Sequence, residues 1–288
     1  MSAEGKSGDG GTSASPAAAG TPSACAADDP RGGIGVLIIG DEITLGRRQD
    51  KHFARIIEIL ATRGLTLDWA TYHGDDRARL TDTLRRSLAG DDIVFSCGGI
   101  GNTPDDHTRQ AAAAAAGVPL ELHPAADREI RARFAEIGRE VSSYSLDMGR
   151  FPVGSRIIPN PFNRIPGFSF GHHHFVPGFP QMAWPMIEWV LDTYYAARFH
   201  RTPSAEAALR VWQGIESVLT PLMLRIEAEF PGIKVFSLPF LGSETLGRHV
   251  ELGVRGDPQR VPAAMALMRR EVAALGYAFD DRPAAEPS

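Results

Sequence analysis

The alternation of short apolar runs with amphipathic segments constrains the fold of this chain more than any other feature of its sequence. It begins at Ile34, where the β-branched run IGVLII precedes Gly-Asp-Glu. Four further segments continue it: a helical pattern in 50–64, a strand pattern in 65–73, a helical pattern in 75–90 and a strand pattern in 92–97. Such an order predicts parallel βαβ units, so we expect an α/β domain with a three-layer, parallel-type sheet and helices on both faces.

The remaining segments predict a second, smaller unit. We expect helices in 124–140 and 180–199 and short strands in 154–161, 165–170 and 172–178. Between the end of the first of these helices and Arg150, no element is assigned. Beyond residue 200 the patterns predict strand, helix, strand, strand, helix, which is a small α+β domain. The predicted boundaries are a disordered leader in 1–33, a first domain in 34–197, a second in 198–280 and a tail in 281–288.

Composition excludes several classes of protein. The net charge of −5, with acids and bases interspersed, argues against a nucleic-acid binder. No apolar run is long enough to span a membrane. We expect no signal peptide, because the leader has no basic start followed by an apolar stretch, and its lack of Leu, Ile, Val and aromatic residues predicts disorder. The two cysteines, Cys25 and Cys97, match no zinc spacing, which favours a reduced, cytoplasmic setting.

The loop SCGGIGNTPDDHTRQA, in 96–111, combines glycines with neighbouring carboxylates. Thr103 is a suitable N-cap, Pro104 suits the first helical position, and Asp106 complements the exposed N–H groups of a first turn. The sequence therefore predicts that the alanine-rich helix begins at Pro104 with Thr103 as its N-cap, and such a start needs no ligand. It does not explain the glycines before it, which would let a phosphate approach the backbone: Gly98, Gly99 and Gly101.

Acidic residues follow all three of the first predicted strands. In an open parallel sheet, ligands bind beyond the carboxyl ends of the strands. We therefore expect six acidic side chains to crowd one edge: Asp41, Glu42, Asp75, Asp76, Asp105 and Asp106. Their repulsion would be relieved by a divalent cation held by one or two carboxylates and by substrate phosphates. The alternative is that Asp75 and Asp76 only cap the helix that follows them.

Four separated motifs carry a resemblance to a known family. They are GDEI in 40–43, HGDD in 73–76, CGGIGNTPDDHT in 97–108, and IPNPFNRIPGF in 158–168 with PGFPQM in 177–182. In this order they resemble the MoaB/Mog-like molybdopterin-binding domains, and more closely the amino-terminal domain of competence/damage-inducible protein A. The resemblance covers about residues 34–195, and the segment 200–280 is similar to the small domain that follows in the same proteins. We expect no carboxy-terminal amidase domain, and so no deamidation of nicotinamide nucleotides.

The resemblance implies a site for the phosphates of a pterin or a nucleotide. Its implied phosphate-binding residues are Gly98, Gly99, Gly101, Asn102, Thr103 and Thr108. It implies Asp75 and Asp106 as the catalytic residues. A divalent cation, Mg²⁺ or another, would be held by Asp41, Asp105 and Asp106. We also expect a homo-oligomer, as is common in the family.

Three functions remain open at this point. The first is magnesium-dependent hydrolysis of the pyrophosphate in ADP-ribose or FAD, which the closer branch implies. The second is binding or adenylylation of molybdopterin, as in the Mog branch. The third is a binding module without turnover, favoured by departures from the family's motifs: Asn102 replaces a usual Pro, Gln181 a usual Glu, and His52 a usual Asn.

Other candidate residues have a structural and a functional reading. His172 and His174 would share one face of a strand, with His173 on the other, and a metal site would need a third ligand. His107 and the pair Arg47 and Arg48 could contact a phosphate, although solvated side chains are the simpler reading. We expect Trp184, Trp189 and Phe199 in the core, and Cys97 as a small buried residue.

Overall fold

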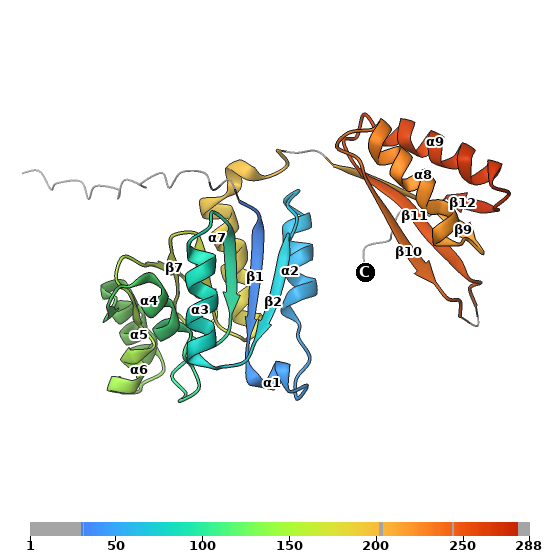
Figure 1. The fold of residues 1–288 in the computed structure, drawn as a ribbon. Coiled ribbons are helices and arrows are strands. Elements are labelled where there is room, and N and C mark those ends of the chain that lie inside the picture. The colour runs from blue at the N-terminus through green and yellow to red at the C-terminus, as the bar shows by residue number, and fades with distance from the viewer. Residues whose placement is uncertain (1–29, 31, 202–203, 244, 282–288) are drawn as a thin grey trace, which may run out of the picture.

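A six-stranded sheet organises the first part of the chain (Figure 1). The computed structural model describes residue 30 and residues 32–201, 204–243 and 245–281. In spatial order the strands are β2 (Trp69–His73), β1 (Ile34–Ile39), β3 (Ile93–Cys97), β8 (His173–Val176), β7 (Gly167–Phe170) and β6 (Arg156–Ile158). The first four are parallel, whereas β7 and β6 add antiparallel strands at one edge. The predicted strands are confirmed, and the sheet is mixed.

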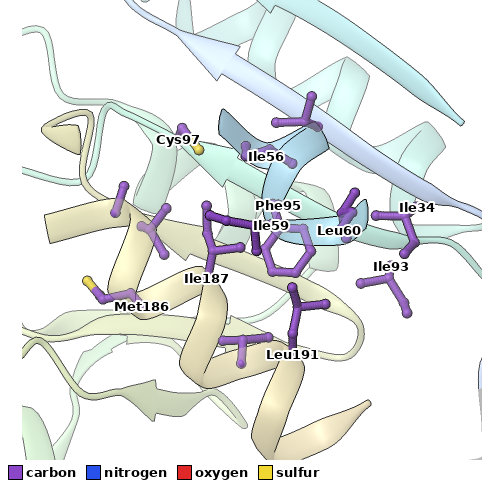
Figure 2. Packing of buried hydrophobic residues seen from close by; sticks show 14 of the residues in the cluster. Ile34, Ile56, Ile59, Leu60, Ile93, Phe95, Cys97, Met186, Ile187 and Leu191 are labelled. Carbon is purple, nitrogen blue, oxygen red and sulfur yellow. The ribbon is translucent and has the colours of Figure 1, made fainter. Parts of the chain in front are cut away.

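Helices cover both faces of this sheet, as predicted. One face carries α2 (His52–Ala61) and α7 (Pro180–Tyr194), and the other α3 (Arg77–Leu88) and α4 (Thr108–Ala116). Alternate side chains of β1 enter the two cores, because successive residues of a strand point to opposite faces. Figure 2 shows the first core, where Ile56 and Ile59 of α2 and Ile187 of α7 meet Phe95 of β3. Short helices, α1 (Asp41–Thr44) and η1 (Ala196–Arg198), complete this part.

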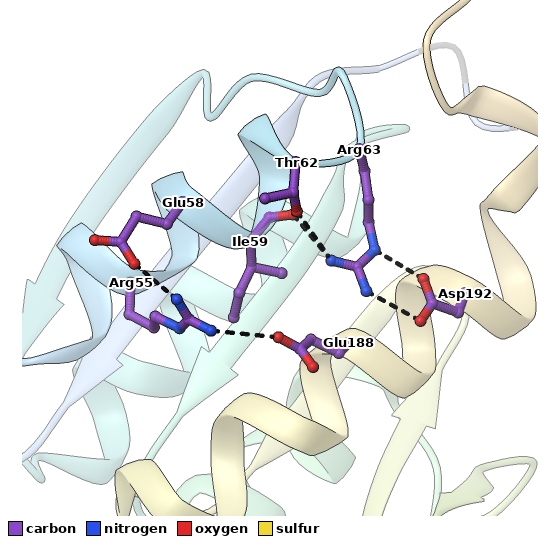
Figure 3. A network of polar contacts seen from close by, with 7 residues as sticks. All are labelled: Arg55, Glu58, Ile59, Thr62, Arg63, Glu188 and Asp192. Carbon is purple, nitrogen blue, oxygen red and sulfur yellow. Dashed lines mark hydrogen bonds and ion pairs between the residues drawn. The ribbon is translucent and has the colours of Figure 1, made fainter. Parts of the chain in front are cut away.

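Ion pairs join α2 to α7 outside the hydrophobic contact (Figure 3). Arg63 donates Nε and a terminal nitrogen to the two carboxylate oxygens of Asp192, at 2.7 and 3.0 Å. Arg55 bridges Glu58 of its own helix, at 2.8 Å, and Glu188 of α7, at 3.6 Å. The bidentate pair fixes the relative position of the two helices, because both N–H···O bonds require one orientation.

The segment between α4 and β6 forms a small projection that the sequence predicted only in part. It comprises β4 (Leu120–Leu122), α5 (Pro124–Glu136), α6 (Ser143–Asp147) and β5 (Arg150–Pro152), with β4 and β5 paired antiparallel. The predicted helix in 124–140 is α5, which ends earlier. Stacked aromatic rings attach the projection to the sheet. The ring centroids of Phe151 and Phe168 lie 4.7 Å apart, and those of Phe168 and Phe175 lie 4.4 Å apart.

A separate four-stranded antiparallel sheet follows. Its order is β10 (Lys234–Phe240), β11 (His249–Gly256), β9 (Ala205–Trp212) and β12 (Phe279–Asp281). The helices α8 (Glu216–Glu229) and α9 (Val261–Ala274) pack on one face, around a core of their own. The predicted order of strand, helix, strand, strand, helix is confirmed, and β12 is an additional strand. Residues 1–29 and 31 of the predicted leader, and 282–288 of the predicted tail, lie outside the described residues.

Candidate functional site

The loop that joins β3 to α4 owes two of its glycines to close backbone packing. Gly98 has φ of 113°, and a Cβ atom there would lie 2.2 Å from the carbonyl oxygen of Ile39. Gly99 has φ of 67°, and its Cβ would lie 2.2 Å from Oγ1 of Thr108. The hydroxyl of Thr108 donates to the Gly98 carbonyl at 3.0 Å, and its N–H to the Gly99 carbonyl at 3.0 Å. We call residues 98–102 the glycine loop. Its path requires glycine at both positions.

The predicted helix start at Pro104, capped by Thr103, is wrong, since α4 begins at Thr108 with His107 at the N-cap position. The Asp106 carboxylate accepts the backbone N–H of Thr103 at 2.8 Å and also its hydroxyl proton. These bonds close a tight turn in front of the helix, with Asp106 N–H donating back to the Thr103 carbonyl at 3.0 Å. This turn forms in place of an earlier helix start because the Asp106 carboxylate accepts from the backbone N–H and the hydroxyl of Thr103.

The glycine loop presents backbone donors that the protein does not use. The N–H groups of Gly99, Ile100, Gly101 and Asn102 donate to no other residue in the part of the chain that the structure describes. Consecutive N–H groups near a residue with positive φ, such as Gly99, form a concave site suited to an anion. The arrangement provides donors for phosphate oxygens at the carboxyl end of β3.

Two of the predicted acidic residues each accept a hydrogen bond from the other's backbone beyond the neighbouring strands. The N–H of Asp41 donates to Oδ2 of Asp75 at 2.8 Å, and the N–H of Asp75 donates to Oδ1 of Asp41 at 3.2 Å. The other oxygen of each carboxylate accepts no hydrogen bond from a described residue. Burial raises the pKa of Asp75, the N–H of Asp41 lowers it, and the negative charges of Asp41, Asp105 and Glu42 raise it further. A cation near Asp75 would remove this repulsion.

The other acidic residues have different surroundings. The carboxylate of Asp76 accepts the N–H of Arg79 at 2.8 Å, which is the capping role that the alternative reading proposed. Asp106 is engaged with Thr103 in the turn. Across the described residues, no group of three or more His, Cys, Asp or Glu side chains is placed to hold a metal ion. The predicted set of Asp41, Asp105 and Asp106 is therefore not brought together as a ready-made metal site.

Arg109 is a site residue that the sequence reasoning missed. Its side chain is buried, and its terminal nitrogens donate to the carbonyls of Gly101 in the glycine loop and of Asp147 in the projection. Burial lowers its pKa, while the charges of Asp106 and Asp147 oppose the shift. A hollow of about 340 Å³ adjoins it, lined also by Asn102 and Tyr144. The only sequence signal was an arginine inside an otherwise alanine-rich helix.

The remaining candidates are structural or peripheral. The rings of His172 and His174 both contact the Tyr195 hydroxyl, at 3.0 and 2.8 Å, and His173 faces Ser87 on the other side, so the predicted alternation is confirmed. Cys97 is buried, as predicted, and burial raises its pKa. The aromatic residues predicted for the core are partly buried against it: Trp184, Trp189 and Phe199. Arg48 lies 3.7 Å from Glu42, whereas Arg47 and His107 make no ion pair with a described residue.

Comparison with known proteins identifies the fold. Residues 35–196 match the model of a family described as the probable molybdopterin binding domain. The chain belongs to this family. Among curated proteins, the CinA-like protein of Anaeromyxobacter sp. (strain Fw109-5) is 32% identical over 242 residues, which are 77% of this chain and 58% of that protein. The putative competence-damage inducible protein of Symbiobacterium thermophilum is 32% identical over 168 residues, covering 57% of this chain and 39% of that protein.

A solved structure agrees with this placement. The protein CinA from Thermoplasma acidophilum, described as having unknown function, is 26% identical, with a TM-score of 0.51 over 56% of this chain and 97% of that one. The predicted family is confirmed: this is a molybdopterin-binding-fold protein of the CinA branch. The chain spans only about half the length of the curated relatives that it matches. No helix within the described ranges is both long and apolar enough to cross a membrane.

Proposed function

We propose that the first domain binds a phosphorylated nucleotide at the glycine loop and hydrolyses its pyrophosphate with the help of a divalent cation. One observation carries the proposal: the unused N–H groups of Gly99 to Asn102 follow β3 at the same sheet edge at which Asp41 and Asp75, which follow the neighbouring strands β1 and β2, bond to each other. Anion donors and cation-seeking carboxylates at one sheet edge suit a ligand that brings phosphates and a metal together. ADP-ribose and FAD are the substrates that we propose.

The open oxygen of Asp41 fits a hard cation such as Mg²⁺ that takes its remaining ligands from phosphate and water. When bound, the cation would supply positive charge at a phosphoryl oxygen. The N–H groups of the glycine loop would hold the phosphates and stabilise the negative charge that develops on them. Asp75, whose pKa is raised by burial, is the residue that we propose to orient or deprotonate the attacking water. Asp106 would act by fixing the loop through Thr103.

The test is release of AMP from ADP-ribose or FAD by the purified full chain with Mg²⁺. We expect Asp75→Asn to abolish release. Asp76→Asn is the matched control, because it removes the same charge one residue away, while asparagine retains the helix cap that Asp76 provides. Absence of AMP release from the wild-type protein refutes the hydrolase, and equal activity of both variants refutes the role proposed for Asp75.

Molybdopterin is the second candidate ligand, and the family match favours it. The same loop donors would bind its phosphate. A fluorescent pterin that copurifies with the protein would support this candidate, and its consistent absence would count against it. Thermal stabilisation by a nucleotide without turnover would instead support a binding module.

A further inference from the structure

The loop that joins β6 to β7 exposes an aromatic ring to solvent. We call this loop, residues 159–166, the proline loop. Phe162 lies near its centre, and the residue is 64% exposed. Single exposed apolar residues are common on protein surfaces, so the exposure of this ring indicates a function only together with its surroundings.

Hydrogen bonds within the proline loop hold the backbone around Phe162 in one conformation. The buried side chain of Asn160 accepts from the N–H of Phe162 at 3.0 Å and donates to the carbonyl of Ile165 at 2.9 Å. The N–H of Arg164 donates to the Asn160 carbonyl at 2.9 Å. Arg164 has a φ of 63°, a conformation that costs free energy in a residue other than glycine and persists only where its surroundings impose it.

Contacts on both sides fix the proline loop to the rest of the domain. The Arg164 guanidinium lies 2.9 Å from a carboxylate oxygen of Glu129 and 2.8 Å from one of Glu136, both in α5. Toward α7, Nδ2 of Asn163 lies 3.3 Å from Sδ of Met182. The exposed phenyl ring therefore belongs to an anchored loop, and little backbone entropy would be lost when a partner covers it.

A groove of about 340 Å³ lies directly beside this ring. Pro161 and Arg164, which lie on either side of Phe162 in the chain, both line it, and so does Trp189 of α7. The other lining residues include three more prolines: Glu129, Ile157, Pro159, Asn160, Pro166 and Pro185. Phe162 does not line the groove itself. Because an apolar cavity of about 150 Å³ accommodates a benzene ring, this groove has room for a phenyl side chain.

The charges at the edge of the groove argue against a polyanionic partner. Glu129 and Glu136 both pair with Arg164, so two carboxylates surround one guanidinium. The excess of negative charge disfavours a nucleic acid or an acidic membrane surface. The groove offers a partner mainly apolar and aromatic surface, which suits an apolar side chain.

We propose that this face joins two copies of the chain, with the Phe162 ring of each copy inserted in the groove of the other. The ring and the groove lie next to each other, so a two-fold axis can bring each ring to the partner's groove and form the same contact twice. An aromatic ring buried in a fitted pocket is a common anchor of protein interfaces. Ile137, which follows Glu136 and is 42% exposed, would add apolar surface at the edge of the contact. This interface does not depend on the function proposed for the glycine loop.

The first experiment measures the association of the purified full chain by sedimentation velocity over a range of concentrations. We expect the wild type to form a dimer. In Phe162→Asp the dissociation constant should rise about a hundredfold or more, because both rings of the dimer are replaced by carboxylates. Leu224→Asp is the matched control, since Leu224 in α8 of the second domain is also 64% exposed, and it should leave the dissociation constant unchanged.

A second experiment locates the ring by photo-cross-linking. The substitution Phe162→p-benzoylphenylalanine keeps an aromatic ring at this position and makes it photoreactive. Unlabelled chains and chains labelled with a heavy nitrogen isotope are mixed and irradiated. Mass spectrometry should then find cross-links between the two kinds of chain, from position 162 to residues 157–166 or 180–194, which contain most of the groove.

Several results would overturn the proposal. A wild type that remains monomeric at every concentration has no such interface. If Phe162→Asp associates as the wild type does, or if Leu224→Asp weakens the dimer equally, the ring is not its anchor. Cross-links confined to single chains, or found between chains but outside the groove, would also refute the insertion. If Phe162→Asp does not fold, as judged by its melting curve, the cross-link decides.

Discussion

Acid should destabilise the first domain through the buried histidine His173. This residue of β8 is 2% exposed, and its ring contacts the hydroxyl of Ser87 in α3. Burial, helped by the charge of His172 and opposed by Asp92, lowers the pKa of His173 from 6.5 to about 4. Between these two pH values, His173 is therefore protonated in the unfolded chain and neutral in the folded chain. Stability is fully present well above pH 6.5 and falls as the pH drops from 6.5 towards 4.

The size of the effect follows from the two pKa values. Between pH 7 and pH 5 the unfolded histidine becomes almost fully protonated, while the folded one stays about nine-tenths neutral. Integration over this interval gives a loss of about 2 kcal/mol from this residue alone. His174, fully buried, has its pKa lowered well below 6.5 by burial and adds a loss of the same sign.

The assay is urea unfolding at pH 7 and pH 5, followed by tryptophan fluorescence, since Trp69, Trp184 and Trp189 all pack against the core of the first domain or its flanks. The comparison is the loss between the two pH values, so any change in stability at pH 7 cancels. We expect His173→Gln to reduce that loss by about 2 kcal/mol. His200→Gln, at an exposed histidine, is the control. An unchanged loss in His173→Gln would refute the reasoning.

Three further predictions concern stability and reactivity. Arg63→Met should lower the free energy of unfolding by about 1 kcal/mol, because the bidentate ion pair with half-exposed Asp192 is lost. An unchanged urea midpoint would show that this ion pair does not stabilise the contact with α7. Cys97, whose pKa is raised by burial, should resist a thiol reagent until the protein unfolds, and labelling of the native protein at this residue, read by mass spectrometry, would contradict it. Gly98→Ala should lower the melting temperature far more than Gly46→Ala. Both glycines have positive φ, but only a Cβ at position 98 would collide with a neighbouring carbonyl oxygen, that of Ile39. Equal shifts in melting temperature would contradict this collision.

The positions of many site residues along the strands and loops were predictable, because the sequence patterns that set them extend over only a few residues. Glycines at the end of β3 and acidic residues after β1 and β2 were recognisable from the strand patterns that precede them. The alternation of His172 and His174 against His173 follows from the two-residue period of a strand. In each case the physical cause, apolar periodicity or backbone conformation, acts over a few residues and is visible in the sequence.

The partners of the acidic residues were not predictable in the same way. Six carboxylates were expected at one edge of the sheet. Which of them lie together depends on their hydrogen bonds, some to distant segments and some within a local turn. Asp75 pairs with Asp41, which is 34 residues away, while its neighbour Asp76 turns to cap α3. Asp106 forms a turn with Thr103 and so moves the start of α4.

The sequence by itself determined the α/β alternation, the place of the glycine loop at a strand end, the small α+β unit and the family. The tertiary structure alone decided the antiparallel edge strands, the burial of Arg109 between the glycine loop and the projection, where it donates to two carbonyls, and the cavity beside His52 and Trp184. The reason is physical. Periodicity fixes which face of an element is buried, whereas cavities and polar pairings depend on the packing of elements that are far apart in the chain.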